Sequence, residues 1–77
     1  MLSVDHAQTI RENGERFVDD HAYDGVHTWW DDEGRHDTPI VELLEYRRNR
    51  DDGWSQDIKD AFYEGAMARC RELGFTR

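Results

Sequence analysis

The sequence predicts a mainly α domain of three helices, with a short aromatic and acidic loop or β-hairpin between the first two. Apolar residues recur at helical spacing in three segments, about residues 5–22, 39–50 and 56–73. Each segment is bounded by residues that commonly start or end helices. Residues 23–38 fit neither the spacing nor the composition of a helix. We therefore expect one small acidic domain that covers residues 1–77.

The first helix is expected to begin at Asp5, which with Gln8 has the spacing of a capping box. Gly14 lies on the apolar face of this helix. Glycine costs about 1 kcal/mol relative to alanine inside a helix, so close packing against another helix is the expected reason for it. Asp19 and Asp20 lie near the C-terminal end, where the helix macrodipole disfavours acids. These two acids are therefore either solvated or part of a binding surface.

The segment after the first helix has the composition of a hairpin. Residues 26–30 are mostly β-branched or aromatic, which favours a short strand. Residues 31–34, Asp-Asp-Glu-Gly, suit a type I turn that ends in a left-handed glycine, and the polar residues 35–37 would return as a second strand. A two-stranded hairpin is marginal alone in water, so we expect it to pack on the helices or to remain a loop.

Thr38 and Pro39 predict the start of the second helix, because threonine is a common N-cap and proline suits the first helical position. Ser55 is the expected N-cap of the third helix, and Gly74 is expected to end it in a left-handed conformation. Lys59, the single lysine, is expected to be an exposed residue of this helix.

Small residues form a ridge on the third helix at Ala61, Gly65 and Ala68, where another helix can approach closely. One hypothesis is that a second copy of the chain packs there, in a homodimer or a salt-adapted structural subunit. Cys70 is the only cysteine, so it cannot form an internal disulfide. It has no base near it in the sequence and is expected to be a small core residue.

The formal net charge is −8, and most of it lies in the N-terminal half. Residues 1–22 carry five acids and two arginines, and residues 23–38 carry five acids and one arginine. Direct nucleic-acid binding is disfavoured because it needs a basic surface. A basic protein surface is the favoured partner, through electrostatic complementarity. The competing explanation is salt adaptation, since aspartate outnumbers glutamate and arginine outnumbers lysine.

The N-terminal residues lack the basic start and apolar run of a signal peptide. No window approaches the roughly 18 apolar residues that span a bilayer. We therefore expect no membrane partner and a cytoplasmic location, which is the host cytoplasm if the protein is phage-encoded.

The candidate partner-binding surface is centred on Trp29 and Trp30, which would point to opposite faces of a strand. Tryptophan is enriched in interface hot spots, although both side chains could instead be needed to build a small core. The full candidate set consists of the aromatic and acidic residues of this region, namely Tyr23, Asp24, Trp29, Trp30, Asp31, Asp32, Glu33, Asp19 and Asp20.

A metal site is the alternative use of the same segment. His27, His36 and Asp37 carry donor atoms that suit Zn²⁺ or Mn²⁺, with further carboxylates nearby. Their spacing is irregular, so we expect no metal or other cofactor. If such a site did form, the protein would be a metal- or ligand-responsive regulatory module.

Catalytic motifs are not found: the chain has no phosphate-binding glycine loop, zincin pair or nucleophile elbow. We therefore expect no catalytic residues and no enzyme. The preferred hypothesis is a small acidic protein–protein interaction module that docks on a basic surface. In one version it is an inhibitor that mimics nucleic acid and occupies a nucleic-acid-binding groove. Small phage-encoded anti-defence proteins act in this way, and the chain is similar to them in size and charge only.

Overall fold

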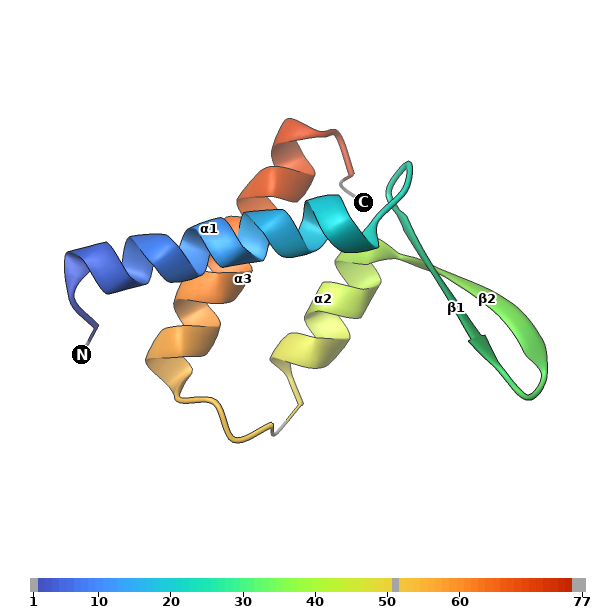
Figure 1. The fold of residues 1–77 in the computed structure, drawn as a ribbon, viewed down its shortest axis with the longest axis horizontal. Coiled ribbons are helices and arrows are strands. Elements are labelled where there is room, and N and C mark those ends of the chain that lie inside the picture. The colour runs from blue at the N-terminus through green and yellow to red at the C-terminus, as the bar shows by residue number, and fades with distance from the viewer. Residues whose placement is uncertain (1, 51, 76–77) are drawn as a thin grey trace.

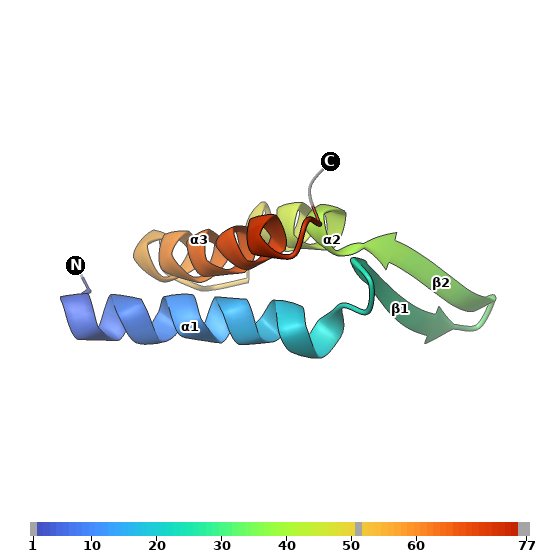
Figure 2. The same ribbon diagram turned by 90° about the horizontal axis from the view of Figure 1, so that it is seen from above.

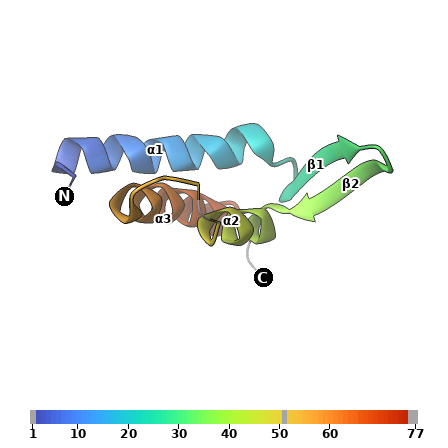
Figure 3. The same ribbon diagram turned by 90° about the horizontal axis from the view of Figure 1, so that it is seen from below.

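The computed structural model describes residues 2–50 and 52–75. Its elements are α1 (Val4–His21), β1 (Val26–Asp31), β2 (Gly34–Pro39), α2 (Ile40–Arg48) and α3 (Gln56–Glu72). The predicted mainly α class is confirmed, and of the two forms expected for the insertion, a loop or a β-hairpin, the structure has the hairpin. The helices form two layers, with α1 in one and α2 and α3 in the other, as Figures 1, 2 and 3 show. The hairpin extends beyond the helices at one end, and the molecule measures 42 × 28 × 19 Å.

α1 and α3 cross at two buried glycines, Gly14 and Gly65. A Cβ atom on Gly14 would lie 2.0 Å from the carbonyl oxygen of Phe62, and one on Gly65 would lie 2.0 Å from that of Arg11. The close packing expected at Gly14 is therefore present. The small-residue ridge of α3 receives α1 of the same chain at Gly65, so a second copy cannot occupy that position while this packing is intact.

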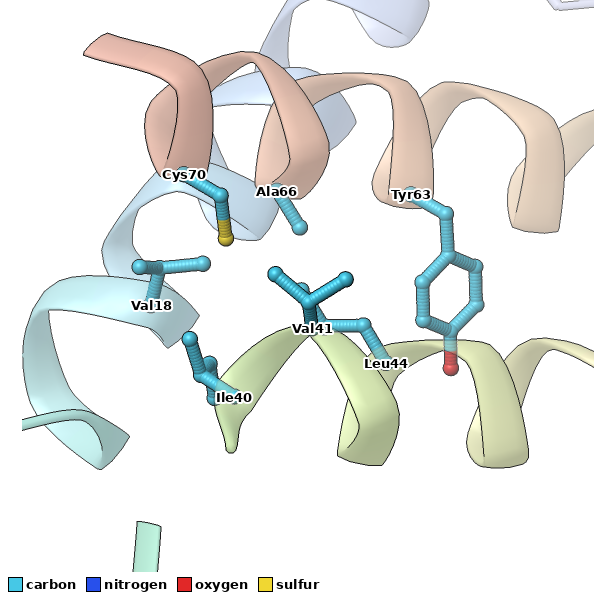
Figure 4. Packing of buried hydrophobic residues seen from close by; sticks show 7 residues of the cluster. All are labelled: Val18, Ile40, Val41, Leu44, Tyr63, Ala66 and Cys70. Atoms are coloured by element: carbon cyan, nitrogen blue, oxygen red, sulfur yellow. The ribbon is translucent and has the colours of Figure 1, made fainter. Parts of the chain in front are cut away.

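The core lies where the C-terminal half of α1 meets α2 and α3 (Figure 4). Its seven buried residues are Val18, Ile40, Val41, Leu44, Tyr63, Ala66 and Cys70. Cys70 is fully buried, and this burial raises the pKa of its thiol. A buried thiol of raised pKa is a poor nucleophile at neutral pH, so Cys70 acts as a small apolar side chain.

Both predicted N-caps of the first two helices are wrong. α1 begins earlier, with Ser3 as N-cap, and the Ser3 Oγ atom accepts a hydrogen bond from the His6 backbone N–H at 3.1 Å. α2 begins later, because Thr38 and Pro39 belong to β2. The Thr38 hydroxyl accepts a hydrogen bond from the Trp29 indole, so it does not cap the helix. α2 also ends at Arg48, two residues before the predicted end.

The predicted ends of α3 are confirmed. Ser55 caps its N-terminus, with Oγ accepting from the Ile58 N–H at 3.4 Å. Gly74 has a φ of +77° after the last turn. The Phe75 N–H then donates to the Cys70 carbonyl at 2.7 Å, and the Gly74 N–H donates to that of Arg71 at 3.2 Å, which is a Schellman motif.

The prediction that Lys59 is exposed is wrong, since its exposed fraction is only 9%. Its ammonium donates to the backbone carbonyls of Arg48 and Arg50 and lies 3.5 Å from the Asp52 carboxylate. These carbonyls lie at the C-terminal end of α2, which carries the negative end of the helix dipole. Lys59 of α3 therefore closes the end of α2.

Candidate functional site

The hairpin arm, residues 26–39, is joined to α1 by a tight turn at Asp24 and Gly25. Both residues have positive φ angles, +52° and +81°. Tyr23 and Val26 exchange two backbone hydrogen bonds, of 2.8 and 3.1 Å, across this turn. Two central residues with positive φ define a type I′ turn, for which Asp-Gly is a preferred sequence. The sequence contained this signal, and the prediction of the hairpin missed it.

The base of the hairpin arm is also tied to α2. The Ile40 N–H, at the first residue of α2, donates to the Gly25 carbonyl at 2.8 Å. β2 ends at Pro39 and α2 begins at the next residue. The hairpin arm is therefore connected to the helices through short segments at both ends.

β1 and β2 form an antiparallel ladder of six residue pairs, from Val26 opposite Pro39 to Asp31 opposite Gly34. At the tip, the Asp31 carboxylate accepts from the Glu33 N–H at 2.8 Å, and Gly34 has a φ of +112°. The predicted positive-φ glycine is confirmed. The hairpin was expected to pack on the helices or to remain a loop. It contacts the helices near its base, through His27, and otherwise projects past them (Figures 2 and 3).

One face of the hairpin arm carries a chain of side-chain contacts. The Trp29 indole stacks on the His36 ring with centroids 4.3 Å apart, and its Nε1 donates to the Thr38 hydroxyl at 3.0 Å. His36 Nε2 lies 2.8 Å from the Asp31 carboxylate. Cross-strand aromatic pairs of this kind stabilise a two-stranded ladder. These contacts explain how an arm with little helix contact keeps its register.

The same face continues onto α1. His27 Nδ1 lies 2.9 Å from the carbonyl oxygen of His21, a hydrogen bond in the tautomer with this nitrogen protonated. The His21 ring stacks on Phe17 with centroids 4.1 Å apart. The Arg47 guanidinium of α2 lies over the Phe17 ring, 4.8 Å from the ring centroid. A row of rings thus links the base of the arm to the helical body.

The opposite face of the hairpin arm carries Trp30, which is 71% exposed. Its neighbours on this face include Thr28, Arg35 and Asp37. The Asp37 carboxylate accepts hydrogen bonds from the Thr28 hydroxyl at 2.8 Å and from Arg35 Nε at 3.1 Å. The Thr28 hydroxyl, and then the Arg35 guanidinium, lower the pKa of Asp37.

The two tryptophans occupy opposite faces, as the strand pattern predicted. Trp29 is 40% exposed even though it stacks on His36, so neither indole belongs to the core. Three exposed carboxylates, Asp31, Asp32 and Glu33, lie at the tip beside them.

The remaining predicted partner-binding residues lie near the base of the hairpin arm or on α1. Tyr23 is 89% exposed, and Asp24 and Asp20 are also exposed. Asp19 has a different role. Its carboxylate accepts from Arg69 Nε of α3 at 2.8 Å, so it joins the two long helices. This ion pair accounts for an acid near the C-terminal end of α1.

A cleft of about 660 Å³ lies between the base of the hairpin arm, the start of α2 and the end of the described chain. Its lining combines apolar and acidic side chains with backbone, from Asp24, Gly25, Pro39, Val41, Glu42, Leu73, Gly74 and Phe75.

The three metal candidates are divided between the two faces of the hairpin arm. His27 and His36 lie on the face of Trp29, whereas Asp37 lies on the face of Trp30. Within residues 2–50 and 52–75, no three histidine, cysteine, aspartate or glutamate side chains are grouped to hold a metal ion. In the same part of the chain, no helix has the length and apolar character to cross a membrane.

Comparison with protein-family models gave no match, and neither did searches of curated proteins and of solved structures. Function is therefore inferred from the residues and geometry of the chain itself.

Proposed function

We propose that the protein is a small acidic protein–protein interaction module, which docks its hairpin arm on a basic surface of a partner protein. The observation that carries this proposal is the exposure of Trp30, 71%, on an arm that extends away from the helical body. An exposed indole costs solubility, and tryptophan is the residue type most enriched in interface hot spots.

The charge of the segment supports a basic partner. Residues 23–38 carry five acids and one arginine, and that arginine is paired with Asp37. The tip carboxylates Asp31, Asp32 and Glu33 are exposed beside the two indoles. Such an arrangement steers a basic surface to the tip and leaves the aromatic rings to provide the buried contact.

In a narrower version of this proposal, the partner is a nucleic-acid-binding protein and the module is its inhibitor. The exposed tip carboxylates would then replace nucleic-acid phosphates in a basic groove.

To test the proposal, a photo-crosslinking residue replaces Tyr23 and is used to capture the partner. The captured partner is then identified and its charge is determined. We expect Trp30→Ala to reduce capture at least tenfold, and Asp31→Asn/Asp32→Asn to reduce it similarly and to weaken its dependence on salt. Tyr46→Ala is the matched aromatic control, because Tyr46 is 65% exposed on α2. Asp5→Asn/Glu12→Gln removes the same charge from α1.

Equal effects of the hairpin variants and their controls would reject this surface. Capture of an acidic partner would reject the electrostatic part of the proposal.

A further inference from the structure

We infer that the hairpin arm binds its partner by strand addition, with an extended basic segment of the partner pairing along the free edge of β1. This inference rests on the proposed function and specifies how the docking occurs.

The backbone of β1 offers hydrogen-bonding groups on its outer edge. Val26 exchanges hydrogen bonds with Tyr23, on the side of β1 away from β2. Backbone groups alternate in direction along an antiparallel strand, so those of Thr28 and Trp30 also point away from β2. Among the described residues, no backbone group outside the ladder hydrogen-bonds to Thr28 or Trp30. Both residues are exposed.

The two edges of the hairpin arm differ in how well they are protected against pairing. The outward positions of β2 are Arg35, Asp37 and Pro39, and charged residues and proline are the usual means of blocking an edge. β1 has neither proline nor an acid or base other than His27 before Asp31. Its open positions are a threonine and a tryptophan, which favour pairing. A partner strand would therefore join β1 rather than β2.

The charge of the arm selects the chemistry of that strand. A strand paired with Thr28 and Trp30 reaches the tip, where Asp31, Asp32 and Glu33 are exposed. Basic side chains at its tip-facing end would meet these carboxylates, and apolar side chains would lie against Trp30. A second copy of the chain fits less well, because two segments of the same negative charge would be brought together.

The experiment uses a synthetic ten-residue peptide of alternating lysine and valine as the probe. Its binding to the full chain is followed by NMR titration and by the hydrogen exchange of individual amides. We expect the Thr28 and Trp30 amides to become protected, and the Arg35 and Asp37 amides to remain unchanged. A peptide of alternating glutamate and valine should bind at least tenfold more weakly.

Two pairs of variants isolate the backbone contribution. Thr28→Pro removes an outward N–H that the ladder does not use, and Thr28→Val serves as its side-chain control. Asp37→Pro and Asp37→Val form the corresponding pair on β2. All four variants lose the hydrogen bond between the Thr28 hydroxyl and the Asp37 carboxylate. We expect Thr28→Pro to bind at least tenfold more weakly than Thr28→Val, and the Asp37 pair to bind equally.

Protection of the Arg35 and Asp37 amides, equal losses in the two proline variants, or absence of peptide binding would overturn strand addition. If Thr28→Pro binds normally while Trp30→Ala does not, side-chain docking holds and the proposed function survives without strand addition. Failure of the capture experiment rejects the proposed function itself. Self-association that Thr28→Pro abolishes would replace the basic partner by a second copy.

Discussion

Replacing Gly14 by alanine is expected to destabilise the protein strongly, even though alanine is the better helix former. The added Cβ would lie 2.0 Å from the Phe62 carbonyl oxygen and 2.9 Å from the Ala66 nitrogen, whereas ordinary contacts begin at 3.4 Å. Both neighbours are backbone atoms, so no rotation of a side chain can relieve the overlap. α1 and α3 must instead move apart by roughly 1 Å, which opens the close-packed interface around the crossing.

The size of the effect follows from two opposing contributions. Overpacking of a core costs typically about 1–3 kcal/mol, and a contact with rigid backbone belongs at the upper end. The helix propensity of alanine returns about 1 kcal/mol. The free energy of unfolding should therefore fall by about 2 kcal/mol, which lowers Tm by roughly 8–16 °C in a domain of this size.

The assay is thermal and urea denaturation followed by circular dichroism. Asn13→Ala is the matched control, because Asn13 is the exposed neighbour of Gly14 in α1. It should leave stability unchanged or raise it slightly. Gly65→Ala should act like Gly14→Ala, and the double variant should lose less than the sum, since one separation of the helices relieves both overlaps. A Gly14→Ala protein that melts at or above the wild-type Tm would refute the close approach of α1 and α3 at Gly14.

Four further predictions concern the rest of the chain. Lys59→Met should lower the free energy of unfolding by about 1–3 kcal/mol in urea denaturation, because it leaves the carbonyls at the end of α2 without their charged donor; an unchanged midpoint would contradict this role. The pKa of Asp37 is lowered from 3.8, so its contribution to stability is present above that pH and is lost as the pH falls through the lowered pKa. Thr28→Val should therefore reduce the change of tryptophan fluorescence as the pH is lowered from neutral through this titration, and an unaltered acid response would count against the contact. The protein should be folded in about 0.1 M KCl as well as in about 2 M KCl, two conditions on either side of strong electrostatic screening. Folding only at the higher salt concentration would instead indicate that its acidity is a salt adaptation. Zn²⁺ and Mn²⁺ should leave Tm unchanged, because a site that bound either ion in the folded state would raise it.

The helices could be predicted because their signals are local. Ser55, Gly74 and the apolar periodicity of residues 56–73 place α3 within one residue at its ends. Lys59 shows a limit of prediction from local sequence signals. Its ammonium binds carbonyls that lie 9 and 11 residues earlier in the chain, at the end of another helix. No pattern within one helix reveals such a partner, so a lysine in an amphipathic segment is read as exposed.

The hairpin arm was predictable in part. The strand composition of residues 26–30 and the glycine at position 34 indicate the hairpin, and the Asp24-Gly25 pair is a sequence signal for the turn at its base. The role of Thr38 and Pro39 cannot be predicted from the sequence alone, because the same pair suits a helix start and a strand end. The projection of the arm depends on the direction in which a type I′ turn sends the chain after α1, which spacing alone does not encode.

The continuous passage of β2 into α2 has a mechanical consequence. No residue separates Pro39 from Ile40, and Ile40 is itself fully buried in the core. With Gly25 hydrogen-bonded to the same residue, the arm has no hinge of several residues at its base. A partner bound at the tip, as proposed, would therefore also fix the direction of the helical body, at little cost in orientational entropy. The angle between the hairpin arm and the helices would stay fixed, so a partner bound to the arm would hold the helices in one orientation.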